Sequence, residues 1–204
     1  MRAGTLVLWR LRRSKLGGSG PRLFQSTVEQ VYTHYAAAVA GVPYEMLKAA
    51  SRRAWAVSRP ELFDFVVPFL EELRRRGYVA VLISGSPEEA VEVAAADLGI
   101  QYSYGARVAV AAGRCLARLE RAPGYPGEKL RCLQVLRERV PLDLSRSLAI
   151  GDSASDIELL NVVGYPAAFE PDMEMATVAR ERGWPCVDRE TVLQVSLGLL
   201  VENG

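Results

Sequence analysis

Short apolar segments alternate with amphipathic helical segments over residues 59–187, and this alternation constrains the fold more than any other feature of the chain. Residues 78–83 form a near-continuous apolar run, as in the buried strands of parallel sheets. Shorter apolar runs occupy residues 147–150 and 166–169, with helical periodicity between them. This order predicts a doubly wound, mainly parallel α/β sheet of the Rossmann-like kind.

A block with helical periodicity and no strand signal precedes the alternating region. The breaker residues 17–21 come before this block, and residues 41–43 divide it into two helices. A buried stripe on the first helix is predicted from apolar side chains at three- and four-residue spacing: Val28, Val31, Tyr35 and Val39. We expect the block to be a small helical cap inserted into the α/β domain.

Three regions follow from these patterns. Residues 17–57 are the predicted helical cap, and residues 58–204 are the predicted α/β core domain. Within the core, Ser58 is a candidate N-cap for a helix whose first turn holds Pro60 and Glu61. Residues 1–16 remain as a short N-terminal region before the cap.

The composition favours a cytoplasmic globular protein. The 204 residues carry 25 basic and 24 acidic side chains, so no global charge points to a nucleic-acid or membrane partner. No apolar run approaches the roughly 18–20 residues that cross a bilayer. The three cysteines lie far apart and form no Cys-x-x-Cys pair, which indicates neither a zinc site nor a disulfide framework. We expect a monomer or homodimer.

Two carboxylates lie on the turn after one predicted strand. Residues 148–156 read Leu-Ala-Ile-Gly-Asp-Ser-Ala-Ser-Asp, so Asp152 and Asp156 follow a strand at the edge where open α/β sheets bind ligands. Such a pair suits Mg²⁺, which one or two carboxylates usually hold together with phosphate oxygens and water. The alternative is an ordinary strand–turn–helix connection with Asp156 as the N-cap.

Two further positions suit an anion. Ser84 and Gly85 follow the first clear strand, where a hydroxyl and backbone N–H groups can bind a phosphate oxygen. Lys129 stands at a predicted helix start, where a cation opposes the helix dipole and a nearby anion would compensate. The alternatives are a plain N-capping turn at Ser84 and a solvated surface lysine at position 129.

The order of these positions resembles a known family. A strand with Ser84, then Lys129, then a strand with Gly-Asp-x-x-x-Asp is similar to motifs two, three and four of the haloacid dehalogenase superfamily. The segments Ser-Gly-Ser-Pro, Gly-Glu-Lys and Gly-Asp-Ser-Ala-Ser-Asp are most similar to its phosphoserine-phosphatase-like subfamily. In that subfamily a helical cap lies between motifs one and two, where residues 20–57 lie here.

The resemblance implies a Mg²⁺-dependent phosphomonoesterase acting on a small phosphorylated metabolite through an aspartyl phosphate. It implies that Ser84, the Gly85 backbone and Lys129 bind the phosphoryl oxygens, with Lys129 also neutralising charge. It further implies that Asp152 and Asp156 serve Mg²⁺, and that Thr5 stands with Lys129 among the catalytic residues.

The first motif departs from the family pattern. Family members begin with a strand that ends in Asp-x-Asp-Gly-Thr-Leu-Val, whereas this chain begins Met-Arg-Ala-Gly-Thr-Leu-Val. Met1 therefore stands where the nucleophile is expected, and Ala3 where the acid–base Asp is expected. The central strand before them is expected to be missing.

Two interpretations remain open. In the first, the native product carries the missing strand and both Asp residues. In the second, the protein is an inactive homologue that binds phosphate or a partner. For the chain as given, we predict negligible phosphatase turnover. Phosphoserine is a doubtful substrate, because residues 8–13 lack the Glu that receives its amine and Ser155 replaces a common Asn.

Overall fold

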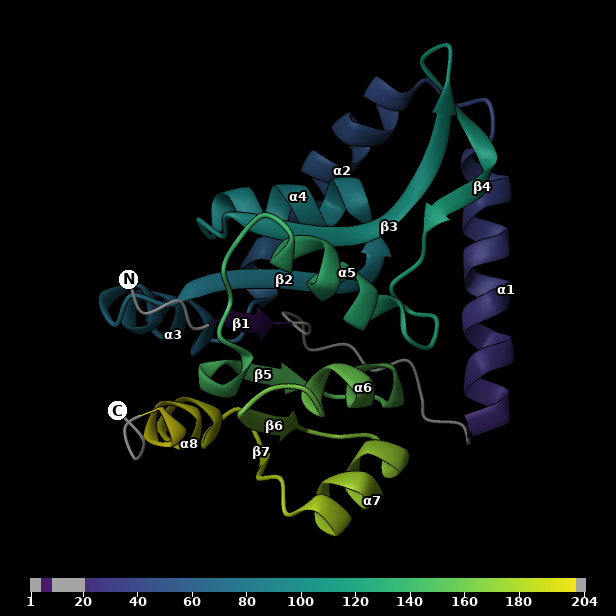
Figure 1. Ribbon diagram of the computed structural model, residues 1–204. Helices are drawn as coiled ribbons and strands as arrows, with labels where there is room; N and C mark the ends of the chain where they lie inside the picture. Colours follow the sequence, from purple (N-terminus) through teal and green to yellow (C-terminus); the bar gives the residue numbers. More distant parts are fainter. Residues whose placement is uncertain (1–4, 9–20, 201–204) are drawn as a thin grey trace.

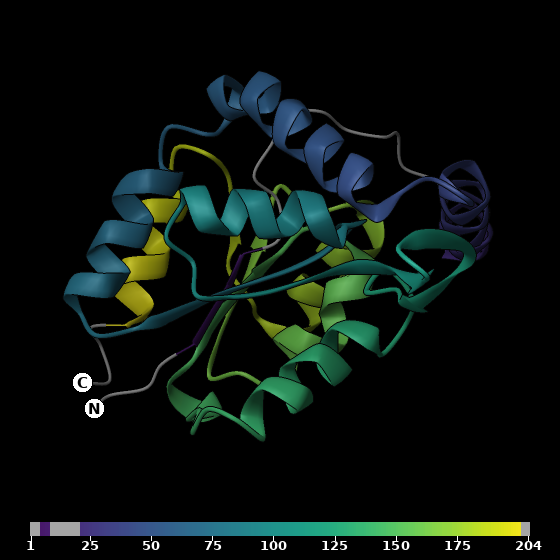
Figure 2. The same cartoon turned by 90° about the horizontal axis from the view of Figure 1, so that it is seen from above.

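A seven-stranded sheet in the order β4-β3-β2-β1-β5-β6-β7 organises the molecule, and helices cover both of its faces (Figures 1 and 2). The computed structural model describes residues 5–8 and 21–200. The strands are β1 (Thr5–Leu8), β2 (Val79–Pro87), β3 (Tyr102–Ala111), β4 (Arg114–Arg121), β5 (Leu148–Gly151), β6 (Tyr165–Phe169) and β7 (Cys186–Val187). All neighbouring strands pair in parallel except β3 and β4, which form an antiparallel hairpin.

The helices alternate with the strands, as the sequence predicts. They are α1 (Pro21–Val39), α2 (Tyr44–Ser58), α3 (Val66–Arg75), α4 (Glu88–Asp97), α5 (Glu128–Arg137), α6 (Ile157–Leu160), α7 (Met173–Arg182) and α8 (Val192–Leu199). Short 3-10 turns are η1 (Arg59–Glu61), η2 (Leu144–Arg146) and η3 (Ala154–Asp156). The predicted α/β fold is confirmed; α8 has no counterpart among the predicted helices.

The two faces of the sheet bury different side chains because strand residues alternate in direction. Leu82 points into a cluster with residues of α3, α4 and α8. Val81 and Ile83, its neighbours on β2, point into a second cluster with residues of α5, α6 and α7. Both faces of β2 are therefore apolar, which accounts for its unbroken apolar sequence.

The expectation that the central strand is missing is wrong. β1 lies between β2 and β5, with Leu8 opposite Leu82 and Val7 opposite Ala149. A gap here would leave two rows of buried backbone groups without partners, and the strand-prone segment Thr-Leu-Val-Leu fills it. In the family pattern this segment follows the strand. Residues 1–4 and 9–16 of the predicted N-terminal region lie outside the described residues.

The helical block is tied to the tip of the β3–β4 hairpin. Gly41 N–H donates to the Cys115 carbonyl (2.8 Å), and Tyr44 N–H donates to the Gly113 carbonyl (2.9 Å). Gly41 has a φ of +76°, a conformation that glycine adopts without steric cost. α1 packs against β4 and α2 against α4 (Figure 1). The boundaries of the cap and core remain a prediction.

Two local predictions are corrected by the structure. Ser58 ends α2, and its hydroxyl donates to the Ala54 carbonyl, so it does not cap a following helix. The next α-helix begins only at Val66. Between Ser58 and this helix lie the short turn η1 and Leu62, which is buried but belongs to no helix. On α1 the buried face is also displaced from the predicted stripe, since Val31 is 52% exposed.

Candidate functional site

Ser84 lies in the carboxyl-terminal part of β2, which continues to Pro87 with an irregular register after Ile83, so the turn predicted at this position is part of the strand. Ser84 is buried, and its Oγ accepts a hydrogen bond from Ser86 N–H (3.1 Å). Pro87, not Ser84, occupies the N-cap position of α4. The alternative interpretation of Ser84 as a plain helix cap is therefore wrong, and its hydroxyl lies at the carboxyl end of a strand instead.

Gly85 is closely approached by the first helix. A Cβ atom at position 85 would lie 2.9 Å from Tyr32 Oη and 3.7 Å from the Gly124 backbone. Tyr32 Oη accepts a hydrogen bond from Gly124 N–H (2.7 Å). The carboxyl-terminal part of β2 thus meets both α1 and the loop that leads to α5, and the absence of a side chain at Gly85 permits this contact.

The turn after β5 is folded around Asp156. Its Oδ2 accepts from the backbone N–H of Asp152 and of Ser153 (both 3.3 Å) and from Ser153 Oγ (3.1 Å). A Cβ at Gly151 would lie 2.4 Å from the Cβ of Asp156, so only glycine fits there. The Asp156 side chain makes no hydrogen bond that caps α6. Asp156 occupies the N-cap position of α6, as the alternative interpretation has it, but its side chain instead closes a capping box with Ser153 at η3 and organises the turn.

Lys129 is buried against this carboxylate. Lys129 Nζ donates to Asp156 Oδ1 (2.6 Å), and the two side chains are 3% and 1% exposed. The alternative of a solvated surface lysine is therefore wrong. Lys129 lies in the first turn of α5, where its charge opposes the helix dipole, and Asp156 is the compensating anion. Removing either partner would take a close opposite charge away from a buried group.

The sheet brings these elements to one edge. β2, β1 and β5 are parallel neighbours, so Ser84 and the Asp152 turn flank the end of β1. Two strand spacings separate these two places by about 10 Å. Lys129 extends from α5 to this edge, where its Nζ donates to Asp156. Thr5, the remaining candidate, begins β1 opposite Val79, so its backbone lies at the other end of the strands from Ser84 and Asp152, and its side chain is outside the described ones.

The metal-binding potential rests on two carboxylates. Within residues 5–8 and 21–200 no group of three His, Cys, Asp or Glu residues forms a complete metal cluster. Asp156 is largely engaged by Lys129 and the turn, whereas half-buried Asp152 follows the strand directly. Because Mg²⁺ keeps several waters and takes few protein ligands, one or two such oxygens fit it when phosphate supplies others.

A second buried carboxylate, Glu88, stands directly after β2. Arg107 and Arg121 of the β3–β4 hairpin both pair with it. Arg121 Nε also donates to the Gly105 carbonyl (3.0 Å), and a Cβ at Gly105 would lie 2.4 Å from the Glu88 Cα. The hairpin is therefore fixed against the first turn of α4. The sequence analysis missed this cluster, because its three members lie far apart in the chain.

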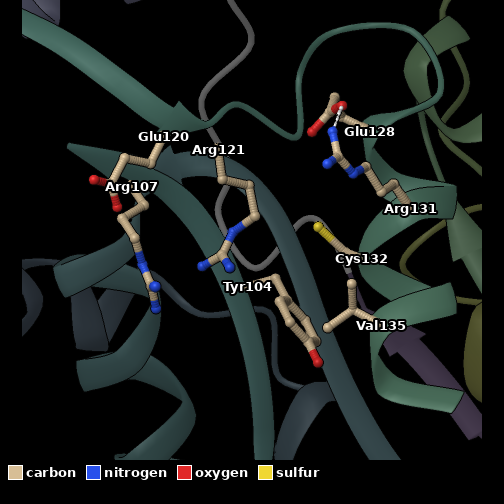
Figure 3. Close-up of a pocket in the computed structure, with 8 residues that line it drawn as sticks. All are labelled: Tyr104, Arg107, Glu120, Arg121, Glu128, Arg131, Cys132 and Val135. Atoms are coloured by element: carbon tan, nitrogen blue, oxygen red, sulfur yellow. Dashed lines mark hydrogen bonds and ion pairs between the residues drawn. The ribbon is translucent and has the colours of Figure 1, made fainter. Parts of the chain in front are cut away.

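A cavity of about 300 Å³ lies between the hairpin and α5 (Figure 3). Its lining residues are Tyr104, Arg107, Glu120, Arg121, Glu128, Arg131, Cys132 and Val135. The Arg121 guanidinium lies 5.1 Å from the centre of the Tyr104 ring. Burial raises the pKa of the Cys132 thiol to about 11. None of the candidate site residues lines this cavity, which is separate from the Lys129–Asp156 pair.

The fold is that of a doubly wound α/β protein, and the candidate site residues lie at the carboxyl edge of its sheet. Residues 1–161 match the haloacid dehalogenase-like hydrolase family. The chain therefore belongs to the haloacid dehalogenase-like hydrolases, as the resemblance implies. No helix of the described residues has the length and apolar character needed to cross a membrane.

The chain spans about half the length of the curated relatives that it matches. The "Inhibition of morphological differentiation protein" of Streptomyces azureus is 32% identical over 63% of this chain and 47% of its own. The phosphoserine phosphatase of Methanocaldococcus jannaschii is 25% identical over 62% of this chain and 58% of its own. The phosphoserine-phosphatase-like resemblance is thereby confirmed.

Solved structures confirm the fold. A protein of unknown function from Bordetella pertussis superposes with a TM-score of 0.69 at 23% identity, covering 79% of this chain and 74% of its own. A substrate-bound phosphoserine phosphatase complex superposes with a TM-score of 0.62 at 23% identity, over 82% and 77% of the two chains.

Proposed function

We propose that the sheet edge formed by Ser84, Lys129 and Asp152 is the phosphate- and Mg²⁺-binding site of a phosphomonoester hydrolase. The observation that carries the proposal is the buried Lys129–Asp156 pair, which joins the start of α5 to the turn after β5. Family membership and the phosphoserine phosphatase relatives support the reaction class. The substrate class is a small phosphorylated metabolite, and a cytoplasmic location remains a prediction.

Each side chain has a distinct part in this proposal. The Ser84 hydroxyl and the Gly85 N–H donate to phosphoryl oxygens. Lys129 adds positive charge where negative charge accumulates, in a site whose dipoles are already fixed. Asp156 holds Lys129 and the turn in place, so Asp152 can present an oxygen to the metal. When bound, Mg²⁺ supplies charge neutralisation to the phosphoryl group.

The sequence has no carboxylate at the positions where the family pattern has its attacking Asp and its acid–base Asp. Met1 and Ala3 occupy the positions where the family pattern has Asp, and residues 9–20 after β1 contain no acidic side chain. Hydrolysis through an aspartyl phosphate therefore needs an Asp that this chain lacks. Phosphate binding needs only the residues described above, so binding and turnover are expected to separate in this chain.

Titration calorimetry with Mg²⁺ and inorganic phosphate tests the binding site. Wild-type chain is expected to bind phosphate only when Mg²⁺ is present. Ser84→Ala is expected to weaken binding about tenfold, since a hydrogen bond to a charged group is lost. Asp152→Asn is expected to abolish the phosphate binding that depends on Mg²⁺. Ser145→Ala and Asp143→Asn are matched controls on η2, which precedes the opposite end of β5.

Two results would contradict the proposal. One is phosphate binding that is absent in wild type, and the other is binding that both site variants retain. Turnover is measured separately with p-nitrophenyl phosphate. Release is expected to be negligible, and Mg²⁺-dependent release that Asp152→Asn abolishes would show that another group replaces the missing nucleophile.

A further inference from the structure

Tyr32 brings a phenol from α1 to the candidate phosphate site. The side chain is 5% exposed, and its Oη accepts from Gly124 N–H at 2.7 Å. The same oxygen lies 2.9 Å from the position of a Cβ at Gly85. Tyr32 therefore touches both the carboxyl-terminal part of β2 and the loop that precedes Lys129.

Two hydroxyl groups at this place share one arrangement. Ser84 Oγ accepts from Ser86 N–H, and Tyr32 Oη accepts from Gly124 N–H. No hydrogen bond among the described side chains, which begin at position 28, uses the hydrogen of either hydroxyl. Each oxygen is thus held by one backbone donor, and the described residues provide no acceptor for either hydrogen. An anion with several oxygens is a suitable acceptor.

We propose that Tyr32 is a substrate-binding residue that donates its hydroxyl hydrogen to an oxygen of the phosphoryl group held at Ser84 and Gly85. This inference rests on the proposed function of the same site. It assigns part of the phosphate site to the helical block, so that α1 contributes directly to substrate recognition.

The surroundings keep this phenol in its donor form and in its position. Burial raises the pKa of Tyr32 to about 12, so the hydroxyl remains protonated at neutral pH. The ring packs edge-to-face against Tyr125, with centroids 5.2 Å apart, and against the buried Ala106 and Ala122. Since the side chain is ordered before the ligand arrives, binding loses little conformational entropy there. A hydrogen bond to a charged oxygen is also stronger than a neutral one.

The test compares Tyr32→Phe with wild type by titration with inorganic phosphate and Mg²⁺. Removing one hydrogen bond to a charged acceptor is expected to weaken binding about 10- to 100-fold. Tyr35→Phe is the matched control, because Tyr35 lies on the next turn of α1 near Glu89 and Cys115. It is expected to bind phosphate within about twofold of wild type. Thermal unfolding checks that both variants are folded.

A second measurement separates direct donation from support of the loop. The hydroxyl proton of Tyr32, identified by its absence in Tyr32→Phe, is expected to move downfield in the ¹H NMR spectrum when phosphate binds. Loss of affinity with an unmoved resonance would mean that Tyr32 acts only through Gly124, and the donor role would be wrong.

The two proposals fail in different ways. If Ser84→Ala weakens phosphate binding while Tyr32→Phe binds like wild type, the role of Tyr32 is overturned and the proposed function stands. If wild type binds no phosphate in the presence of Mg²⁺, both proposals are overturned.

Discussion

Asp156 and Glu88 are buried carboxylates that each follow a strand at the same sheet edge, yet their cations differ in exposure. Asp156 pairs with Lys129, which is 3% exposed. Glu88 pairs with Arg107 and Arg121, whose side chains are 48% and 20% exposed. The first pair is sealed between α5 and the β5 turn, whereas the second faces the open cavity in Figure 3.

The difference in exposure separates a pair in the candidate site, Lys129–Asp156, from a cluster with a structural role, in which Glu88 binds Arg107 and Arg121. Water can solvate much of the arginine charge beside Glu88, so this cluster mainly fastens the hairpin to α4. No solvent reaches Lys129, and its charge is compensated within the protein by Asp156. A buried cation held at a fixed point near Asp152 can act on a bound anion with little screening. The same kind of ion pair thus has different consequences in the two places.

The largest effect is expected for Asp156→Asn. Loss of the carboxylate charge leaves Lys129 buried beside a neutral amide, and breaking such a pair costs about 3–5 kcal/mol of unfolding free energy. Urea denaturation measures this loss. Glu45→Gln, which breaks the exposed Lys48–Glu45 pair, is the control and is expected to cost less than about 1 kcal/mol. Equal losses of unfolding free energy in both variants would contradict the burial of the Lys129–Asp156 pair.

Two glycines near the candidate site, Gly151 at the end of β5 and Gly85 in β2, test how tightly each place is packed. Gly151→Ala places a Cβ 2.4 Å from the Asp156 Cβ and is expected to cost about 3 kcal/mol. Gly85→Ala meets only the end of the Tyr32 side chain at 2.9 Å and is expected to cost about 1 kcal/mol. Urea denaturation of both variants gives the ranking, and a reversed order would contradict the described packing of the two places.

Glu88→Gln is expected to cost about 2 kcal/mol, less than Asp156→Asn, because Arg107 and Arg121 retain solvent contact. Phosphate binding is expected to change little, since Ser84 and Lys129 keep their own partners. Denaturation and titration of the same preparation measure both quantities. A loss of phosphate binding in Glu88→Gln would remove the functional distinction between the two clusters.

The smallest effect concerns Cys132 in the cavity. Burial raises its pKa to about 11, while Arg121 opposes the shift. Its alkylation by iodoacetamide, measured with Cys115 and Cys186 replaced by Ser, is therefore expected to accelerate until pH 11. In Glu88→Gln, Arg121 loses its anion and the midpoint is expected to fall by less than about one pH unit. An unchanged or higher midpoint would show that Glu88 does not offset Arg121.

Local patterns were sufficient for most of the fold. Apolar runs predicted β2, β5 and β6, because these strands are buried on both faces and leave a continuous signal. Ser84, Asp152 and Asp156 could be located because they lie at or shortly after the end of such a run. Parallel topology then places them at one edge without any knowledge of side-chain contacts.

Contacts between distant elements could not be predicted in this way. Tyr32 belongs to a helix on which every third or fourth position is apolar, so nothing distinguishes its hydroxyl from a packing residue. Glu88 and its arginines resemble ordinary surface charges until the hairpin folds over α4. β1 was missed because four residues give little strand signal by themselves, and pairing with two neighbours decides their conformation.

The position of β1 also has a consequence for the time course of folding. Its two partners, β2 and β5, are made much later during synthesis, and β5 follows the whole helical block and the hairpin. The middle of the sheet can therefore close only after β5 has been made, through pairing between strands that are far apart in the sequence. Such topology slows folding and leaves the facing edges of β2 and β5 open to other strands in the meantime.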